Sequence, residues 1–93
     1  MPYKLLATPE FENDYKKLPK EVAIRVDEKL DTLAAHPEQM RYPLKHLPKS
    51  LKGLHKYRVG DYRVLFWPDH ERQEIVLYAI AHRRDIYRSL SNL

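Results

Sequence analysis

The sequence predicts an α+β domain in which an antiparallel sheet carries a helical hairpin on one face. Helical patterns fill much of the first half of the chain, and runs rich in Val, Ile, Tyr, Phe and Leu fill the second half. The chain has 93 residues, of which 43% are hydrophobic and 32% charged, as is typical of one globular domain. We therefore expect a single domain over residues 1–93, with the element order β-α-α-β-β-β-α.

The first strand is expected at Tyr3–Ala7, a short apolar run, and the first helix begins directly after it. Thr8 is suited to capping this helix, and Pro9 is suited to its first turn, where a missing backbone N–H breaks no helical hydrogen bond. Apolar residues then recur at helical spacing, which predicts one buried face. They are Phe11, Tyr15 and Leu18.

A second, longer helix is expected after Pro19, which breaks or bends the first one. This helix should end near His36, because Pro37 disfavours helical backbone in the residue before it. The two helices then form an antiparallel pair. The apolar face of the second helix is Val22, Val26, Leu30 and Leu33.

The second half begins with a proline-rich connector, residues 37–53, in which residues 46–53 could hold a helical turn. Strand-like runs follow at residues 54–67 and 74–81, separated by a polar turn at residues 68–74. The tail predicts a last helix with Ile86, Leu90 and Leu93 on one face.

Charge is distributed unevenly along the chain. Residues 9–38 hold five Lys/Arg against eight Asp/Glu, whereas residues 39–63 hold seven Lys/Arg against one Asp. Such asymmetry favours a polyanionic partner, with nucleic acid first among the candidates. A solvated basic surface is the alternative that charge alone leaves open.

The composition excludes several kinds of site. The chain has no cysteine, so disulfides, thiolate metal sites and cysteine nucleophiles are excluded. The five histidines lack the spacing of metal ligands, and no glycine-rich phosphate loop occurs, so we expect no metal and no small-molecule cofactor. No apolar run approaches the ~18 residues of a membrane span, and the N-terminus lacks a signal-peptide pattern, so we expect no membrane association and a cytoplasmic location.

The central feature is a hairpin around Gly60-Asp61, where glycine suits the first central position of a two-residue type II′ turn. A turn this tight fixes the strand register and places Arg58 opposite Arg63. Side chains alternate across a sheet, so one face gathers apolar residues and should meet the helices. That face, called here the helix face, carries Tyr57, Val59, Tyr62, Val64 and Phe66. The opposite face, called here the cation face, carries Lys56, Arg58, Arg63, Leu65 and Trp67.

Like charges directly opposite each other destabilise a strand pair by roughly 0.2–1 kcal/mol. The pairing of Arg58 with Arg63 therefore indicates that an anion belongs between these side chains. The structural alternative is that the arginine stems lie flat on the sheet while their charged ends reach water. Arg83 and Tyr87 are four residues apart in the tail and share a face if it is helical.

Lys, Arg, Tyr and His are sufficient for metal-free RNA cleavage. In that reaction the RNA 2′-hydroxyl attacks the neighbouring phosphate. A base must take the hydroxyl proton, cations must stabilise the pentacovalent phosphate, and an acid must protonate the leaving 5′ oxygen. A cluster of cations next to a lysine or tyrosine could serve these roles.

The segments "LHKYRVGDYRVLF" and "AIAHRRDIYR" resemble the RelE group of the RelE/ParE toxin superfamily of type II toxin–antitoxin modules. The resemblance extends over nearly the whole chain and implies a RelE-like microbial RNase fold. It also implies a ribosome-dependent mRNA endonuclease that inhibits translation, contacts 16S rRNA and is neutralised by a cognate, RelB-like antitoxin. Such a partner, disordered and acidic, would wrap the domain and cover or displace its C-terminal segment.

Roles carry over by position. Lys56 matches a candidate general base, Arg63 the arginine on the scissile phosphate, Arg83 a second phosphate-stabilising arginine, and Tyr87 a tyrosine that stacks on a base or assists proton transfer. The expected supporting contacts to RNA come from Lys52, Arg58, His82 and Arg84.

This sequence also departs from the family pattern. A second catalytic lysine of some members corresponds to Leu54 here, and Lys52 could substitute for it. His82 is an alternative acid, because related toxins use a histidine near this point. Two other functions remain open: a ParE-like inhibitor of DNA gyrase without nuclease activity, and a non-catalytic RNA-binding module.

Overall fold

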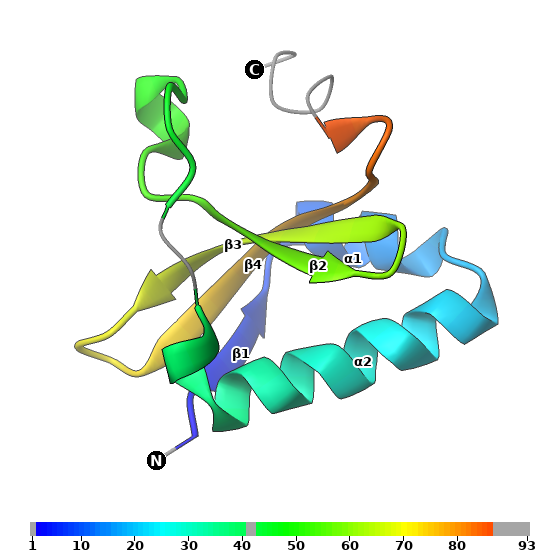
Figure 1. Cartoon of the computed structure of the whole chain (residues 1–93), viewed down its shortest axis with the longest axis horizontal. Helices are drawn as coiled ribbons and strands as arrows, with labels where there is room; N and C mark the ends of the chain where they lie inside the picture. Colours follow the sequence, from blue (N-terminus) through cyan, green and yellow to red (C-terminus); the bar gives the residue numbers. More distant parts are fainter. Residues whose placement is uncertain (1, 41–42, 87–93) are drawn as a thin grey trace.

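The computed structural model describes residues 2–40 and 43–86. Within these residues the strands form one four-stranded sheet in the order β1-β4-β3-β2 (Figure 1). The strands are β1 at Lys4–Ala7, β2 at His55–Val59, β3 at Tyr62–Asp69 and β4 at Glu74–His82. The helices are α1 at Pro9–Lys16 and α2 at Lys20–Ala35, and two 3₁₀ turns lie in the connector, η1 at Pro37–Gln39 and η2 at Lys49–Leu51.

The predicted fold class and element order are confirmed up to β4, but a wholly antiparallel sheet is wrong. β2, β3 and β4 are antiparallel neighbours, whereas β1 runs parallel to β4. Tight turns fix only the relative directions of β2, β3 and β4. β1 enters the sheet through the two helices, so no local turn dictates its direction, and the sheet is mixed. The predicted final helix falls mainly on residues 87–93, outside the described residues.

The predicted helix boundaries are confirmed except at the end of α1, which stops at Lys16, before Leu18. Thr8 caps α1, since its hydroxyl accepts a hydrogen bond from the Phe11 backbone N–H at 3.2 Å, and Pro9 occupies the first turn. Pro19 separates the helices, and α2 ends at Ala35, one residue before the position expected. No helix among residues 2–40 and 43–86 is long and apolar enough to cross a membrane.

The predicted polar turn at residues 68–74 is too long, because β3 continues through Pro68 and Asp69. A proline cannot donate to a sheet ladder and is tolerated only where one side of a strand is free. Here β2 pairs with β3 only as far as Phe66, so the outer side of β3 is open at Pro68. The real turn is therefore four residues, His70–Gln73.

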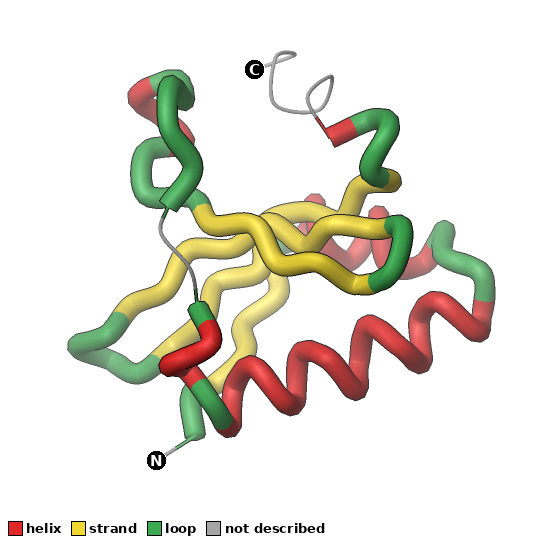
Figure 2. Tube along the Cα trace, in the orientation of Figure 1, coloured by secondary structure: helices red, strands yellow, loops and turns green. Residues whose placement is uncertain are grey.

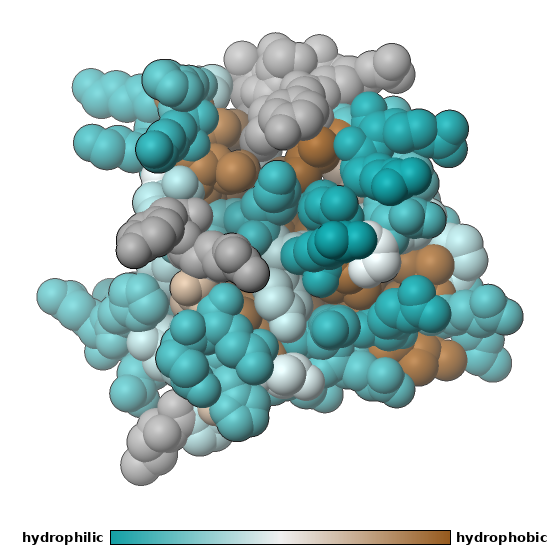
Figure 3. All heavy atoms as spheres, in the orientation of Figure 1, coloured by the Kyte–Doolittle hydropathy of each residue, from teal (hydrophilic) through white to brown (hydrophobic). Residues whose placement is uncertain are grey.

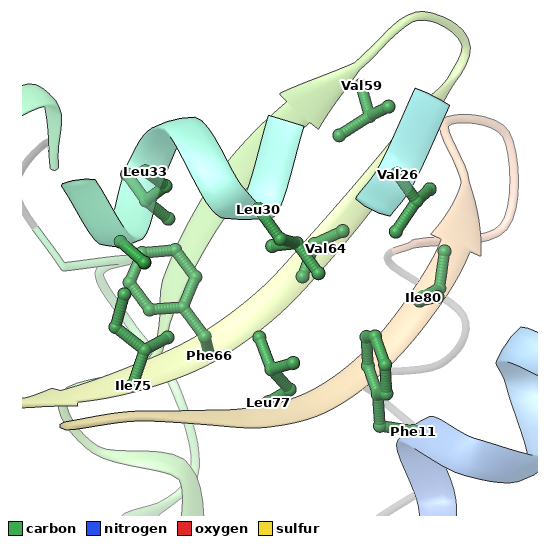
Figure 4. Close-up of a cluster of buried hydrophobic side chains, with 11 residues drawn as sticks. Phe11, Val26, Leu30, Leu33, Val59, Val64, Phe66, Ile75, Leu77 and Ile80 are labelled. Atoms are coloured by element: carbon green, nitrogen blue, oxygen red, sulfur yellow. The ribbon is translucent and has the colours of Figure 1, made fainter. Parts of the chain in front are cut away.

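Both helices cover one face of the sheet, and the main core lies between these two layers (Figures 2 and 4). Phe11 of α1 and the apolar stripe of α2 face the side chains of the helix face. A register shift between Leu65 and Phe66 in the β3–β4 pair leaves Tyr78 of β4 without a partner residue, as at a β-bulge. The core residues are Phe11, Val26, Leu30, Leu33, Ala34, Val59, Val64, Phe66, Ile75, Leu77 and Ile80.

A second apolar cluster covers part of the opposite face. The connector rises on the side of the sheet away from α2, and the chain after β4 rises on the same side (Figure 1). Leu51, Leu54 and Ile86 pack there against Leu65 and Ala81 of the sheet. The connector and the chain after β4 therefore each cover part of the cation face, while Lys56 and Arg58 on the same face are exposed.

The outer edge of β4 is closed by α1 where β1 ends. β1 pairs with β4 only as far as Leu77. Beyond it, the Thr8 hydroxyl donates to the backbone carbonyls of Leu77 and Tyr78, and the Asp14 carboxylate accepts from the Ile80 backbone N–H at 3.0 Å. Side chains of α1 thus replace a neighbouring strand.

Asp14→Ala is expected to lower the free energy of unfolding by about 1–3 kcal/mol, because a partly buried backbone N–H loses a charged acceptor. Urea titration measures the effect. Asp14→Asn retains an acceptor oxygen and should lose less. An Asp14→Ala variant with an unchanged midpoint would show that water satisfies Ile80 equally well.

Candidate functional site

The hairpin that carries the candidate site has the predicted register. Val59 pairs with Tyr62, and Arg58 pairs with Arg63. Gly60 has φ +58°, whereas φ of Asp61 is not positive, as a type II′ turn requires. The helix-face residues Val59, Val64 and Phe66 are buried in the main core. With this register, Lys56, Arg58 and Arg63 lie on the opposite face, as predicted.

Arg63 is held against the hairpin turn. Its Nη1 donates to the backbone carbonyl oxygens of Gly60 at 2.9 Å and Tyr62 at 2.8 Å. Both bonds use Nη1, and they fix the plane of the guanidinium group over the turn. A guanidinium group anchored at one end is well suited to present its other N–H groups to an anion.

Lys56 and Arg58 are exposed on the edge strand β2. Within residues 2–40 and 43–86, neither side chain forms an ion pair. Arg58 lies directly across from Arg63, and no described carboxylate pairs with either of them. The like-charge pair expected from the sequence is thus present and uncompensated in the described part of the chain.

Arg83 is brought beside this pair by β4. Its backbone N–H donates to the Asp61 carbonyl at 2.8 Å, and its Nε lies 3.8 Å from the Asp61 carboxylate. Both side chains of this ion pair are largely exposed, so water screens it strongly. Arg83 therefore borders the hairpin turn and remains free to exchange Asp61 for another anion.

His82 does not join the cation face. It pairs with Tyr62 across the sheet, and the two rings meet edge to face at 5.3 Å between centroids. Because Ala81 pairs with Arg63, the next residue along β4 points to the helix side. Side chains alternate between the two faces along β3, so the β3–β4 register alone assigns His82 to the face of Tyr62.

The remaining sequence-predicted residues are spread around the cation face. Arg84 is exposed, and its backbone N–H donates to His82 Nδ1. Lys52 is exposed in the connector, where its carbonyl accepts from Trp67 Nε1 at 3.2 Å. Leu54 is fully buried, so its position offers no site for an exposed charge. Tyr87 lies outside the described residues.

A groove of about 770 Å³ runs along the open edge of β2 and adds residues that the sequence analysis missed. They come from α2 and from η1, far from the hairpin in sequence, and only tertiary packing brings them next to it. No period or motif could have identified them. The lining residues are Lys29, Glu38, Gln39, Met40, Lys56, Tyr57, Arg58, Arg63 and Phe66.

The chemistry available here is that of cations and hydroxyl groups. Hydrophilic side chains gather over the hairpin in the middle of the view in Figure 3. Burial raises the pKa of Tyr57 above its ordinary value, so its hydroxyl stays protonated as a hydrogen-bond donor at neutral pH. Among the described residues no group of three or more His, Asp or Glu side chains comes together as a metal site would require.

This chain is similar to known toxins both in sequence and in structure. Residues 5–87 match the family described as the ParE toxin of the type II toxin–antitoxin system parDE. Toxin RelG of Mycobacterium tuberculosis is 34% identical over 95% of this chain and 99% of its own length. Toxin RelE of the same organism is 32% identical over 94% of this chain and 88% of its own length.

Two solved structures show the shared architecture. The toxin–antitoxin complex RelBE2 of M. tuberculosis matches with TM-score 0.76 and 30% identity, over 91% of this chain and 95% of that chain. A mutant of E. coli toxin RelE in the free state matches with TM-score 0.74 over 99% of this chain and 97% of that chain, at 17% identity, which supports the fold alone. The chain belongs to the RelE/ParE toxin family of type II toxin–antitoxin systems.

Proposed function

We propose that this toxin is a metal-independent endoribonuclease that cleaves mRNA on the ribosome and is neutralised by a cognate RelB-like antitoxin. The observation that carries the proposal is the pairing of Arg58 with Arg63 on the cation face without a carboxylate from the described residues. An RNA phosphate between them would relieve their repulsion. The similarity to toxins RelG and RelE over nearly the whole chain supports the same function.

In the proposed reaction the 2′-oxygen forms a bond to phosphorus, and the bond from phosphorus to the 5′-oxygen breaks. Arg63, anchored over the turn, and Arg83 stabilise the added negative charge on the phosphate. Lys56, in its neutral amine form, takes the proton from the 2′-hydroxyl. For the acid that protonates the 5′-oxygen we choose Tyr87, the role that the resemblance to the RelE group implies; the alternative acid, His82, points to the helix side of the sheet.

An antitoxin would act by covering the cations. Solved relatives include RelB–RelE complexes from M. tuberculosis, Pyrococcus horikoshii and E. coli. An acidic antitoxin segment that pairs with Lys56, Arg58 and Arg63 would compete directly with RNA for the cation face. Co-purification with the product of the neighbouring reading frame, and loss of cleavage on its addition, is the expected result.

The test uses purified toxin, ribosomes carrying a defined codon in the A site, and the same mRNA without ribosomes. We expect cleavage within the A-site codon and little cleavage of free mRNA. The matching family is described as ParE, so a gyrase supercoiling assay is run in parallel. Inhibited supercoiling with intact mRNA would overturn the proposal, and ribosome binding without cleavage would select a non-catalytic RNA-binding role.

A further inference from the structure

The groove along β2 is continuous with the cation face. Arg58 and Arg63 carry the proposed phosphate contacts, and both also line the groove. The groove passes around the edge of the sheet toward α2, where Lys29 lies, and η1, where Gln39 lies. A nucleic acid strand on the cation face would therefore continue into this groove.

The charge of the groove favours a polyanion. Four of its lining residues are cations and one, Glu38, is a carboxylate. Glu38 Oε1 lies 3.2 Å from His36 Nδ1. Lys29, Lys56 and Arg58 are exposed, and none forms an ion pair within the described part of the chain. Lys29 extends the row of cations beyond the hairpin, toward the next phosphate of a bound strand.

The walls of the groove also suit a nucleobase. Tyr57 and Met40, both half-buried, supply aromatic and apolar surface on which an unstacked base can lie. Gln39 is exposed at the rim, and its amide offers one acceptor and two donor hydrogens to a base edge. Proteins that bind single-stranded RNA commonly combine cations, an aromatic surface and groups that hydrogen-bond to a base edge.

We infer that the β2 groove binds the RNA nucleotide next to the scissile phosphate, with Lys29 on its phosphate and Gln39 selecting its base. The inference rests on the proposed function and deepens it, because the groove then sets which codons are cleaved. Lys29 supplies affinity without regard to sequence, whereas Gln39 supplies discrimination.

Two variants separate these roles in the ribosome assay. Lys29→Glu is expected to lower kcat/KM about tenfold for every codon, as loss of a phosphate contact does. The matched control is Lys20→Glu, the same charge reversal at an exposed lysine of α2 that does not line the groove. Gln39→Ala is expected to change the ratio of kcat/KM between codons by about tenfold while the toxin still cleaves its preferred codon.

These results distinguish the groove from the proposed function. If the wild-type toxin cleaves and both groove variants match the Lys20→Glu control in rate and codon preference, the groove inference is wrong and the nuclease stands. If the wild-type toxin does not cleave, the nuclease proposal fails, and the groove is judged by binding alone.

Binding is measured by NMR with a short RNA whose 2′-hydroxyls are methylated, so that it cannot be cleaved. We expect saturable shifts at the backbone amides of Lys29, Gln39 and Tyr57. Shifts restricted to the turn at Gly60-Asp61, or no shifts at saturating RNA, would overturn the inference. Displacement of the RNA from these amides by a polyglutamate peptide, with no preference among bases, would assign the groove to an acidic protein segment instead and also overturn it.

Discussion

Arg63→Ala is expected to reduce A-site mRNA cleavage by about 10²–10³-fold, the range found when a fixed donor to a developing negative charge is removed. Arg63 is the one hairpin cation whose guanidinium is anchored by two backbone carbonyls in the described structure. Its loss removes a donor that needs no reorganisation as charge builds on the phosphate. Single-turnover cleavage on programmed ribosomes measures the change.

The same substitution should have a small effect on stability. Two hydrogen bonds from Arg63 to the exposed turn are lost, and water can replace both, so each contributes at the low end of about 0.5–1.5 kcal/mol. Relief of the repulsion from Arg58 offsets part of this by roughly 0.2–1 kcal/mol. We expect a net change in the free energy of unfolding of less than about 1.5 kcal/mol.

Arg72→Ala is the matched control, since Arg72 is an exposed arginine whose ion pair with Asp69 lies at the other end of β3. It should leave cleavage unchanged. If Arg63→Ala unfolds the domain, Arg63 is a structural residue and the flat-stem alternative is correct. If Arg63→Ala folds and cleaves at the wild-type rate, the phosphate is held elsewhere.

The cation face could be predicted because its causes are local. A glycine at the first position of a two-residue turn fixes the register, and the period of two then assigns every side chain of the hairpin to a face. The helix boundaries were equally local, set by Thr8, Pro9, Pro19 and Pro37. In each case a single residue type decides the backbone geometry.

The errors arose where distant segments meet. The direction of β1 depends on its docking beside β4, and no tight turn specifies it. The sequence also assigned His82 to no face of the sheet, because that face depends on the β3–β4 register. The β2 groove depends on α2 and η1 packing beside an edge strand. Leu54 lies two residues before Lys56, and the sequence could not show that a second apolar cluster buries this position.

Leu54→Ala is expected to lower the free energy of unfolding by about 2–5 kcal/mol, a large part of the roughly 5–15 kcal/mol that holds a domain folded. Leu54 has no exposed surface and belongs to the second cluster, together with Leu51 of the connector, Leu65 of β3 and Ile86. Its carbonyl also accepts from the Leu44 backbone N–H at 2.9 Å, which closes the connector into a loop. Urea titration measures the loss, and Leu54→Met, which conserves volume, should cost less than about 1.5 kcal/mol.

Leu54→Lys tests what the departure from the family pattern means. A lysine placed at this buried position would lose its hydration without a described carboxylate to replace it, so the variant should be at least as unstable as Leu54→Ala and no more active. In that case position 54 cannot hold the second lysine that the family resemblance implies, and the proposed base, Lys56, would have to act without it. A Leu54→Lys variant with wild-type stability and faster cleavage would instead show that this part of the connector can open. The second apolar cluster, which lies beside the cation face, would then be the element that limits the activity of this toxin.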